Sequence, residues 1–153
     1  MLGVGRESGP DHSELWLDFV EGMGSDREIY GHAPVPEITA LVQHFHKVAS
    51  EGTPEEALAA FYAYESQVPR VAAEKARGLK NTYGADERTC AYFTLHTTAD
   101  VHHSNVWRQQ LGKRIEANPE AANKALAAGE NAAKALWKAL DGIEARRTSK
   151  VAA

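Results

Sequence analysis

Long helical segments dominate the last two-thirds of this sequence. No segment shows the alternation of apolar and polar residues that is typical of a β-strand. The clearest helix start is at Thr53, where a proline follows and Glu56 completes a capping box. We expect this helix to run to about Lys80. Pro69 removes one backbone hydrogen bond, so a bend is predicted there. A chain built in this way folds as an all-α protein.

Two further long helices are predicted after the first. One begins near Asp86 and continues to Asn118, and the other follows the Asn118-Pro119 cap and first turn. The last helix has apolar or small residues at alternating spacings of three and four, which is typical of a bundle seam. The predicted seam consists of Ala122, Leu126, Gly129, Ala133, Leu136, Leu140 and Ile143. These elements predict an antiparallel helical bundle.

Shorter helical segments are predicted nearer the start of the chain. Residues 13–23 and 36–50 both place apolar side chains at helical spacing. Ser25 and Glu28 offer a second capping box between them. No repeat or long linker divides the sequence, so we expect residues 1–153 to form a single domain.

Composition narrows the possible classes of partner. The 153 residues carry a net charge of -4 and are 43% hydrophobic, which fits one globular core and gives no basic surface for nucleic acid or anionic lipid. No apolar run is long enough to span a membrane, and the first residues lack the pattern of a secretion signal. The single cysteine, Cys90, cannot form an internal disulfide. A cytoplasmic protein without nucleic-acid or membrane partners is therefore expected.

Three polar residues share one face of the Asp86–Asn118 helix. At 100° per residue, His96, Asp100 and His103 fall within an arc of about 60°. Two imidazoles and a carboxylate on one face, without a thiolate, favour iron, manganese or zinc. Activation of dioxygen is typical of iron in such mixed sites, so iron is preferred.

Glu65 is the candidate carboxylate from the neighbouring helix. It lies in an apolar and aromatic stretch, where an unpaired carboxylate is costly to bury and a metal would offset that cost. The sequence also allows two other interpretations. The histidines and aspartate could form an ordinary buried hydrogen-bonded network, and Glu65 could pair with Arg70 or Lys75 or face solvent.

The remaining histidines give no comparable pattern. His44 and His46 are two residues apart and so point to opposite sides of a helix, and His12 and His32 fall in predicted loops. Lys75 lies ten residues after Glu65, about 80° away around the same helix, where it could border a cavity. It is either a surface lysine or an amine donor or nucleophile.

The Tyr-Glu-Ser-Gln-Val-Pro segment around Glu65, the later Lys75 and the H-x3-D-x2-H pattern ending at His103 together resemble the TenA/PqqC superfamily. Within it, the chain is most similar to the haem-oxygenase-like diiron oxidases, in the branch of 4-aminobenzoate synthases related to the chlamydial protein associating with death domains. The resemblance implies a haem-oxygenase-like fold over most of the chain.

The same resemblance implies a cofactor and a reaction. Such oxidases hold two non-haem irons, with manganese as an alternative, through six side chains, and four of these match Glu65, His96, Asp100 and His103 here. Dioxygen is the expected co-substrate. Lys75 matches a lysine implicated as the amino donor in making 4-aminobenzoate for folate, and in that branch an internal tyrosine is thought to supply the aromatic ring.

Two metal ligands of the family pattern, a glutamate and a histidine of its first helix, are not identified in this sequence. The family's first helix normally supplies a glutamate and a histidine seven residues apart, and we find no such pair before residue 54, so two ligands are expected to be absent. The donor tyrosine would lie in the same region, and Tyr30 is not assigned to this role. We therefore expect a bundle shortened at its N-terminus, with Met1 as a displaced start. A second chain or a homodimer would then complete it.

Three functional classes follow. The first is an iron-dependent oxidase, and the second is a catalytically incomplete metal-binding or protein-interaction bundle. The third is a TenA-like hydrolase without metal, which would need Cys90 as nucleophile. Cys90 points about 120° away from His96 and is better explained as a packing residue.

Overall fold

The computed structural model describes residues 11–28, 31 and 33–151. This part of the chain contains helices and no strand, which confirms the all-α prediction. In chain order its elements are α1 (His12–Gly22), α2 (Pro36–Glu51), α3 (Pro54–Glu65), α4 (Val68–Tyr83), α5 (Glu87–Ala117), the short 3-10 helix η1 (Pro119–Ala121) and α6 (Ala122–Val151).

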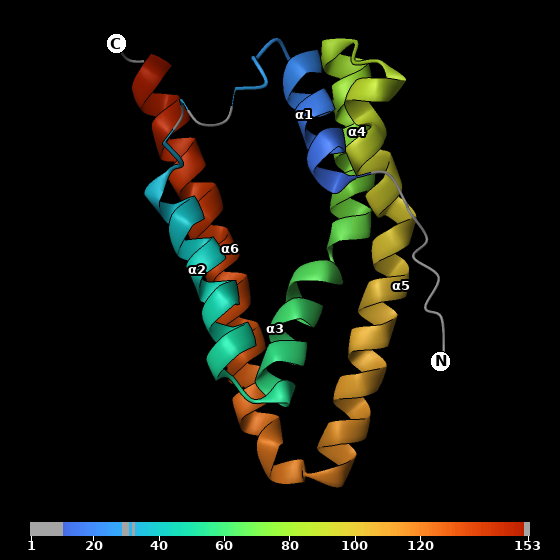
Figure 1. Ribbon diagram of the computed structural model, residues 1–153, viewed down its shortest axis with the longest axis vertical. Coiled ribbons are helices and arrows are strands. Elements are labelled where there is room, and N and C mark those ends of the chain that lie inside the picture. The colour runs from blue at the N-terminus through green and yellow to red at the C-terminus, as the bar shows by residue number, and fades with distance from the viewer. Residues whose placement is uncertain (1–10, 29–30, 32, 152–153) are drawn as a thin grey trace, which may run out of the picture.

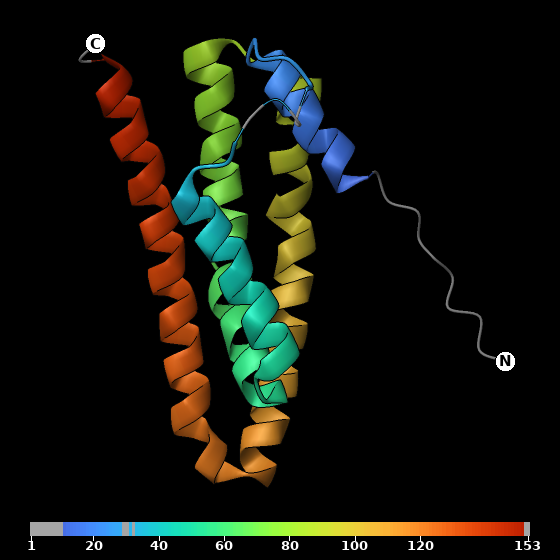
Figure 2. The same cartoon turned by 60° about the vertical axis from the view of Figure 1, so that its left-hand side comes forward.

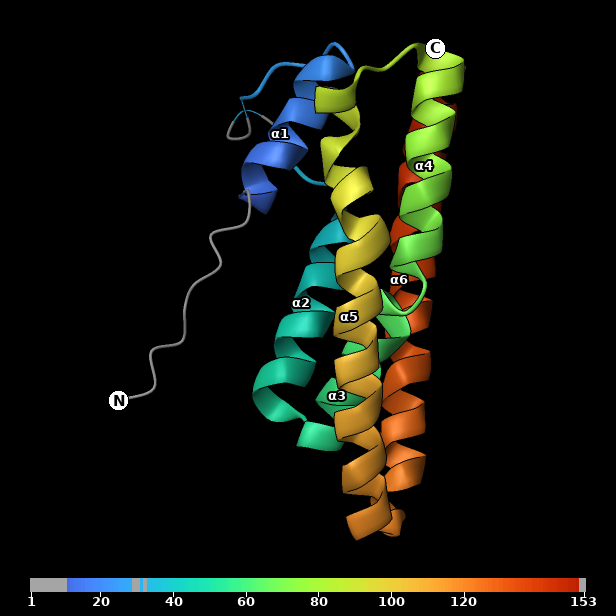
Figure 3. The same cartoon turned by 90° about the vertical axis from the view of Figure 1, so that its right-hand side faces the viewer.

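The helices form two arms that meet at one end (Figure 1). Helices α5 and α6 are the long members of the arms, and η1 joins them at the closed end. Helix α2 packs along α6, whereas α1 and α4 pack on α5, with α4 on the side opposite α1 (Figure 3). Helix α3 contacts both α5 and α6 and so holds the arms together.

Side-chain caps fix where several helices begin. Thr53 and Glu56 form the expected capping box at the start of α3. Asp86 caps α5 by accepting hydrogen bonds from the Thr89 hydroxyl and backbone N–H, and these bonds hold the pKa of its carboxyl below the usual value. The predicted starts at Thr53 and Asp86 are therefore confirmed.

The helix predicted from Thr53 to Lys80 is two helices rather than one bent helix. α3 ends at Glu65, and α4 begins at Val68 after two residues outside either helix. Pro69 lies in the first turn of α4, where a missing N–H costs nothing. It also has no N–H to donate to the Glu65 carbonyl four residues earlier, at the end of α3. The proline therefore starts a new helix instead of bending an old one.

The second capping box was also wrong. Residues 25–28 lie outside any helix, and the Glu28 backbone N–H donates to the Asp26 carboxylate within this loop. A capping pattern without a following apolar periodic segment is a weak signal.

The contact between α3 and α6 is made of small residues. Ala59 and Ala60 of α3 are buried, and Gly129 of α6 approaches so closely that an added Cβ would lie 3.3 Å from the Ala59 carbonyl oxygen. The buried alanines of α6 are Ala125, Ala128, Ala132 and Ala139. The predicted seam was therefore wrong in part, because three of its larger members, Leu126, Leu140 and Ile143, are exposed.

Helix α1 is held against α5 by three kinds of contact. The Phe19 ring meets the Phe93 ring edge-on, with centroids 5.0 Å apart. Asp18 accepts hydrogen bonds from both Arg27 and Arg88, which lower the pKa of its carboxyl. Gly22 lets the end of α1 approach Thr89, since a Cβ there would meet its side chain. These contacts place His12, the first residue of α1, beside His96 in the first third of α5.

None of the described helices combines the length and apolarity that a membrane-spanning segment requires.

Candidate metal centre

Glu65, Asp100 and His103 come together between α3 and α5. One potential ligand atom from each lies within 4.8 Å of those of the other two. The His103 Nδ1 atom is 3.1 Å from Asp100 Oδ1 and 3.7 Å from Glu65 Oε2. Glu65 is the last residue of α3, so the break before Pro69 lies immediately beyond this residue.

The chemistry of this cluster suits a divalent cation. The side chain of Asp100 is 8% exposed and that of Glu65 20%, whereas His103 is 48% exposed and leaves an approach from solvent. Neither carboxylate forms an ion pair with lysine or arginine among the described residues, so the alternative pairing of Glu65 with Arg70 or Lys75 is not observed. Two carboxylates and an imidazole offer only oxygen and nitrogen donors, which suit iron, manganese or zinc.

His96 lies outside this cluster. Its Nδ1 atom is 2.6 Å from the Tyr92 backbone oxygen, one helical turn earlier. Because a carbonyl oxygen only accepts, this contact needs a proton on Nδ1, which in the neutral ring leaves the Nε2 lone pair for a ligand. The ring stacks beside Tyr92 at 4.2 Å and near His12 at 5.0 Å between centroids. The structure therefore brings together three of the four predicted ligands and directs the fourth towards α1.

His12 is the residue that sequence reasoning missed. It was assigned to a loop without any constellation, but it is the first residue of α1 and its ring faces His96. Asp11 caps this helix by accepting from the Ser13 N–H. The signal was present in the sequence, since Asp11 is an N-cap residue directly before the apolar periodic segment.

The expectation that nothing before residue 54 has the seven-residue spacing was wrong, because Glu37 and His44 of α2 have it. Both line a groove against Asn131 and Lys134 of α6, and Glu37 also packs against the position of Gly142. Among described residues, they are not part of the carboxylate and histidine group at Glu65. Spacing alone would therefore have selected residues that face another helix.

Lys75 borders a cavity next to His96. The cavity has a volume of about 460 Å³ and lies among α1, α3, α4, α5 and α6. Its wall includes Trp16, Tyr64, Lys75, Tyr92, His96 and Trp137. The Lys75 Nζ atom lies 5.5 Å from the centroid of the Phe93 ring. Lys75 thus borders a cavity and is also exposed, so its position fits both alternatives, a surface lysine and a residue at a cavity.

Two tyrosines of this cavity have raised pKa values. Burial is the main cause for both Tyr64 and Tyr92, and the negative charge of Asp100 adds to it. Both phenols therefore stay protonated well above neutral pH.

Cys90 does not resemble a nucleophile. It is fully buried in α5, and burial raises the pKa of its thiol above the usual value. Its Sγ atom lies near the Ala76 carbonyl oxygen of α4, in the packing between these helices. These observations weigh against the metal-free hydrolase.

The model of a protein family described as iron-containing redox enzymes matches residues 2–137. The match covers most of the sequence, and the chain belongs to this family. The described helices are consistent with an all-α haem-oxygenase-like bundle.

Individual relatives agree with this assignment. The chain is 38% identical over 136 residues to a 4-aminobenzoate synthase of Nitrosomonas europaea, covering 87% of this chain and 54% of the relative. It is 34% identical to a 4-aminobenzoate synthase of Chlamydia trachomatis, over 88% of this chain and 58% of that protein. A 4-chloro-allylglycine synthase of Streptantibioticus cattleyicolor is 32% identical over 108 residues, which is 69% of this chain and 42% of the relative. The chain thus spans about half the length of these relatives.

Proposed function

We propose that this chain binds non-haem iron at Glu65, Asp100 and His103 and acts as a dioxygen-dependent oxidase. The observation that carries the proposal is the convergence of these three side chains from two helices within 4.8 Å. Membership of a family of iron-containing redox enzymes supports iron as the metal. Bound iron would supply the activation of dioxygen.

A second iron position is proposed at the neighbouring turn of α5. His96 offers Nε2 there, and the ring contact with His12 makes that histidine a candidate partner. Asp100 lies between His96 and His103 in the sequence, so its carboxylate could serve either position. The chain's own residues thus prepare the site by fixing the His96 tautomer and by keeping Asp100 buried.

For the reaction, we propose a role in forming 4-aminobenzoate, with Lys75 as the amino donor. The names of the relatives from Nitrosomonas and Chlamydia support the product. The cavity supports the role of Lys75, because Lys75 and His96 line the same cavity. Tyr64 and Tyr92, whose raised pKa values keep them protonated, line it as well.

Anaerobic titration with Fe(II), followed by metal analysis, tests the site. The wild-type chain is expected to bind iron, and Glu65→Gln, His96→Ala and His103→Ala are each expected to lower its iron content. His102→Ala is a matched control, since His102 is the adjacent, exposed histidine of the same helix. Absence of iron in the wild type, or equal binding in the ligand variants and the control, would contradict the proposal.

A second candidate function is a protein-interaction bundle that is catalytically incomplete alone. One observation favours it: Trp137 is 67% exposed, and Leu140 and Ile143 on the same helix are also exposed. Apolar surface of this kind is typical of an interface. In this case a second copy of the chain would cover α6, and iron would bind without supporting product formation by the isolated monomer.

A further inference from the structure

Trp107 contacts the proposed metal centre from the next turn of α5. Its indole Nε1–H donates a hydrogen bond of 2.8 Å to Glu65 Oε2, across 42 residues of sequence. The same Oε2 atom lies 3.7 Å from His103 Nδ1. One carboxylate oxygen of Glu65 is therefore held between the indole and the imidazole.

The position of this bond is significant because Glu65 has few other restraints. Glu65 is the C-terminal residue of α3, and its side chain also borders a largely apolar pocket beside Phe61 and Tyr64. Without a donor, the carboxylate could rotate towards solvent and away from Asp100. The indole is fixed in turn by its packing near the Phe61 ring, at 6.0 Å between centroids.

We infer that Trp107 is a positioning residue that holds the Glu65 carboxylate towards Asp100 and His103, ready to bind a metal. The inference rests on the proposed function of the Glu65 site. An indole N–H donates at every pH and cannot itself bind the metal, so it orients the ligand without competing for the cation. Donors behind metal ligands commonly raise metal affinity in this way.

Metal affinity measured by competition with a chromophoric chelator tests the role. Trp107→Phe removes the N–H but keeps an aromatic ring, and the affinity for Co(II) or Fe(II) is expected to fall about 10-fold to 100-fold. Trp137→Phe is the matched control, because this tryptophan is exposed on α6 and has no hydrogen bond to the site among the described contacts. A change in the visible Co(II) spectrum in Trp107→Phe, but not in Trp137→Phe, would show altered coordination rather than lower stability.

The hydrogen bond itself can be tested without metal. Glu65→Ala removes both carboxylate oxygens and with them the acceptor of the Trp107 N–H. In the ¹H–¹⁵N spectrum of the metal-free protein, the Trp107 indole signal is expected to move upfield in Glu65→Ala, whereas the Trp16 and Trp137 signals stay in place. An unmoved Trp107 signal would overturn the inference even if Trp107→Phe failed to fold.

The outcomes of the two experiments are distinguishable. Equal metal affinity in wild type and folded Trp107→Phe would overturn the positioning role and leave the metal site intact. Failure of the wild type to bind metal would instead overturn the proposed function, and the positioning role with it.

Discussion

At the scale of single residues, the main electrostatic feature is the pair of carboxylates at Glu65 and Asp100. Both approach His103, and Asp100 is largely removed from solvent. Like charges in partly buried positions repel each other more strongly than in water. In the metal-free protein the arrangement is expected to lower stability, as is common for sites built to bind a cation.

Asp100→Asn should therefore stabilise the metal-free protein while weakening iron binding. The change removes one negative charge but keeps an oxygen that can accept from His103, so we expect a gain of about 1 kcal/mol in the free energy of unfolding. Thermal denaturation in the presence of a chelator should show a rise of about 3 °C. Asp141→Asn, an exposed carboxylate of α6, serves as control and should leave the melting temperature unchanged. A lower melting temperature for Asp100→Asn would show that its hydrogen bond outweighs the repulsion.

The proposed ligand residues show what spacing along a helix can predict. It placed Asp100 and His103 on a shared face, and the structure brings both close to Glu65 of α3, which was chosen from its apolar and aromatic surroundings. It could not predict that the His96 side chain would bond to its own helix, because spacing fixes the direction of Cβ and not the rotamer. The position of His12 depends on the packing of α1 against α5, which no local pattern contains.

At the scale of helices, their starts were more predictable than their breaks. Caps at Thr53 and Asp86 are local hydrogen bonds, so the residues that form them can be recognised in the sequence. Pro69 allowed either a bend or a new helix, and the tertiary contacts of α3 and α4 decided between them. α3 packs on α5 and α6, whereas α4 packs mainly on α5. The break between Glu65 and Val68 allows the two helices to run in different directions and to pack on different helices.

The close approach of α1 to α5 gives a prediction at this scale. Gly22→Ala would place a Cβ 2.0 Å from Thr89 Oγ1, and overpacking there should lower the free energy of unfolding by about 1–3 kcal/mol. Gly112→Ala in α5 is the matched control. A Cβ at Gly112 meets nothing within 4 Å, so this change should raise stability by about 0.5–1 kcal/mol through helix propensity. Urea unfolding of both variants measures the difference, and equal stability would contradict the α1–α5 packing.

At the scale of the whole molecule, the arms are joined through α3 and diverge beyond it. The C-terminal half of α6 stands apart from α1 and α5 (Figures 1 and 2). The predicted seam of α6 assumed that the larger apolar residues face inward. The close contact at Gly129 and Ala59 instead turns alanines inward and leaves Leu126 and Leu140 exposed. Helix periodicity located the apolar faces of α6 but could not predict which of them is buried. That depends on how closely α3 approaches α6.

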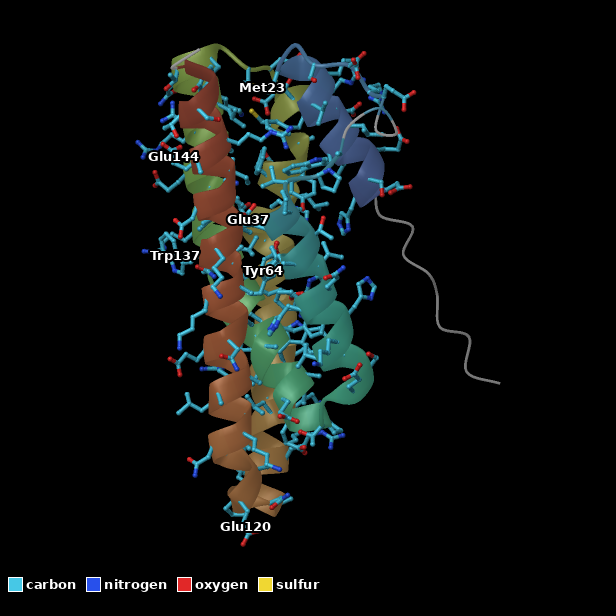
Figure 4. All side chains as sticks on the ribbon, turned by 90° about the vertical axis from the view of Figure 1, so that its left-hand side faces the viewer. Met23, Glu37, Tyr64, Glu120, Trp137 and Glu144 are labelled. Carbon is cyan, nitrogen blue, oxygen red and sulfur yellow. The ribbon has the colours of Figure 1, made fainter. Side chains whose placement is uncertain are left out.

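The exposed part of α6 predicts self-association of the isolated chain. Trp137 projects from the flank of α6 (Figure 4), and with Leu140 it also lines the open cavity beside Lys75. A second copy that covers these side chains would remove apolar surface from water. Sedimentation velocity over a range of concentrations should show a dimer for the wild type and a monomer for the double variant Trp137→Gln, Leu140→Gln. Leu126→Gln is the control, because Leu126 is 73% exposed on the same helix but lies near its start, away from the cavity, and this variant should still dimerise. A wild-type chain that stays monomeric at every concentration would show that α6 tolerates this exposure without a second copy.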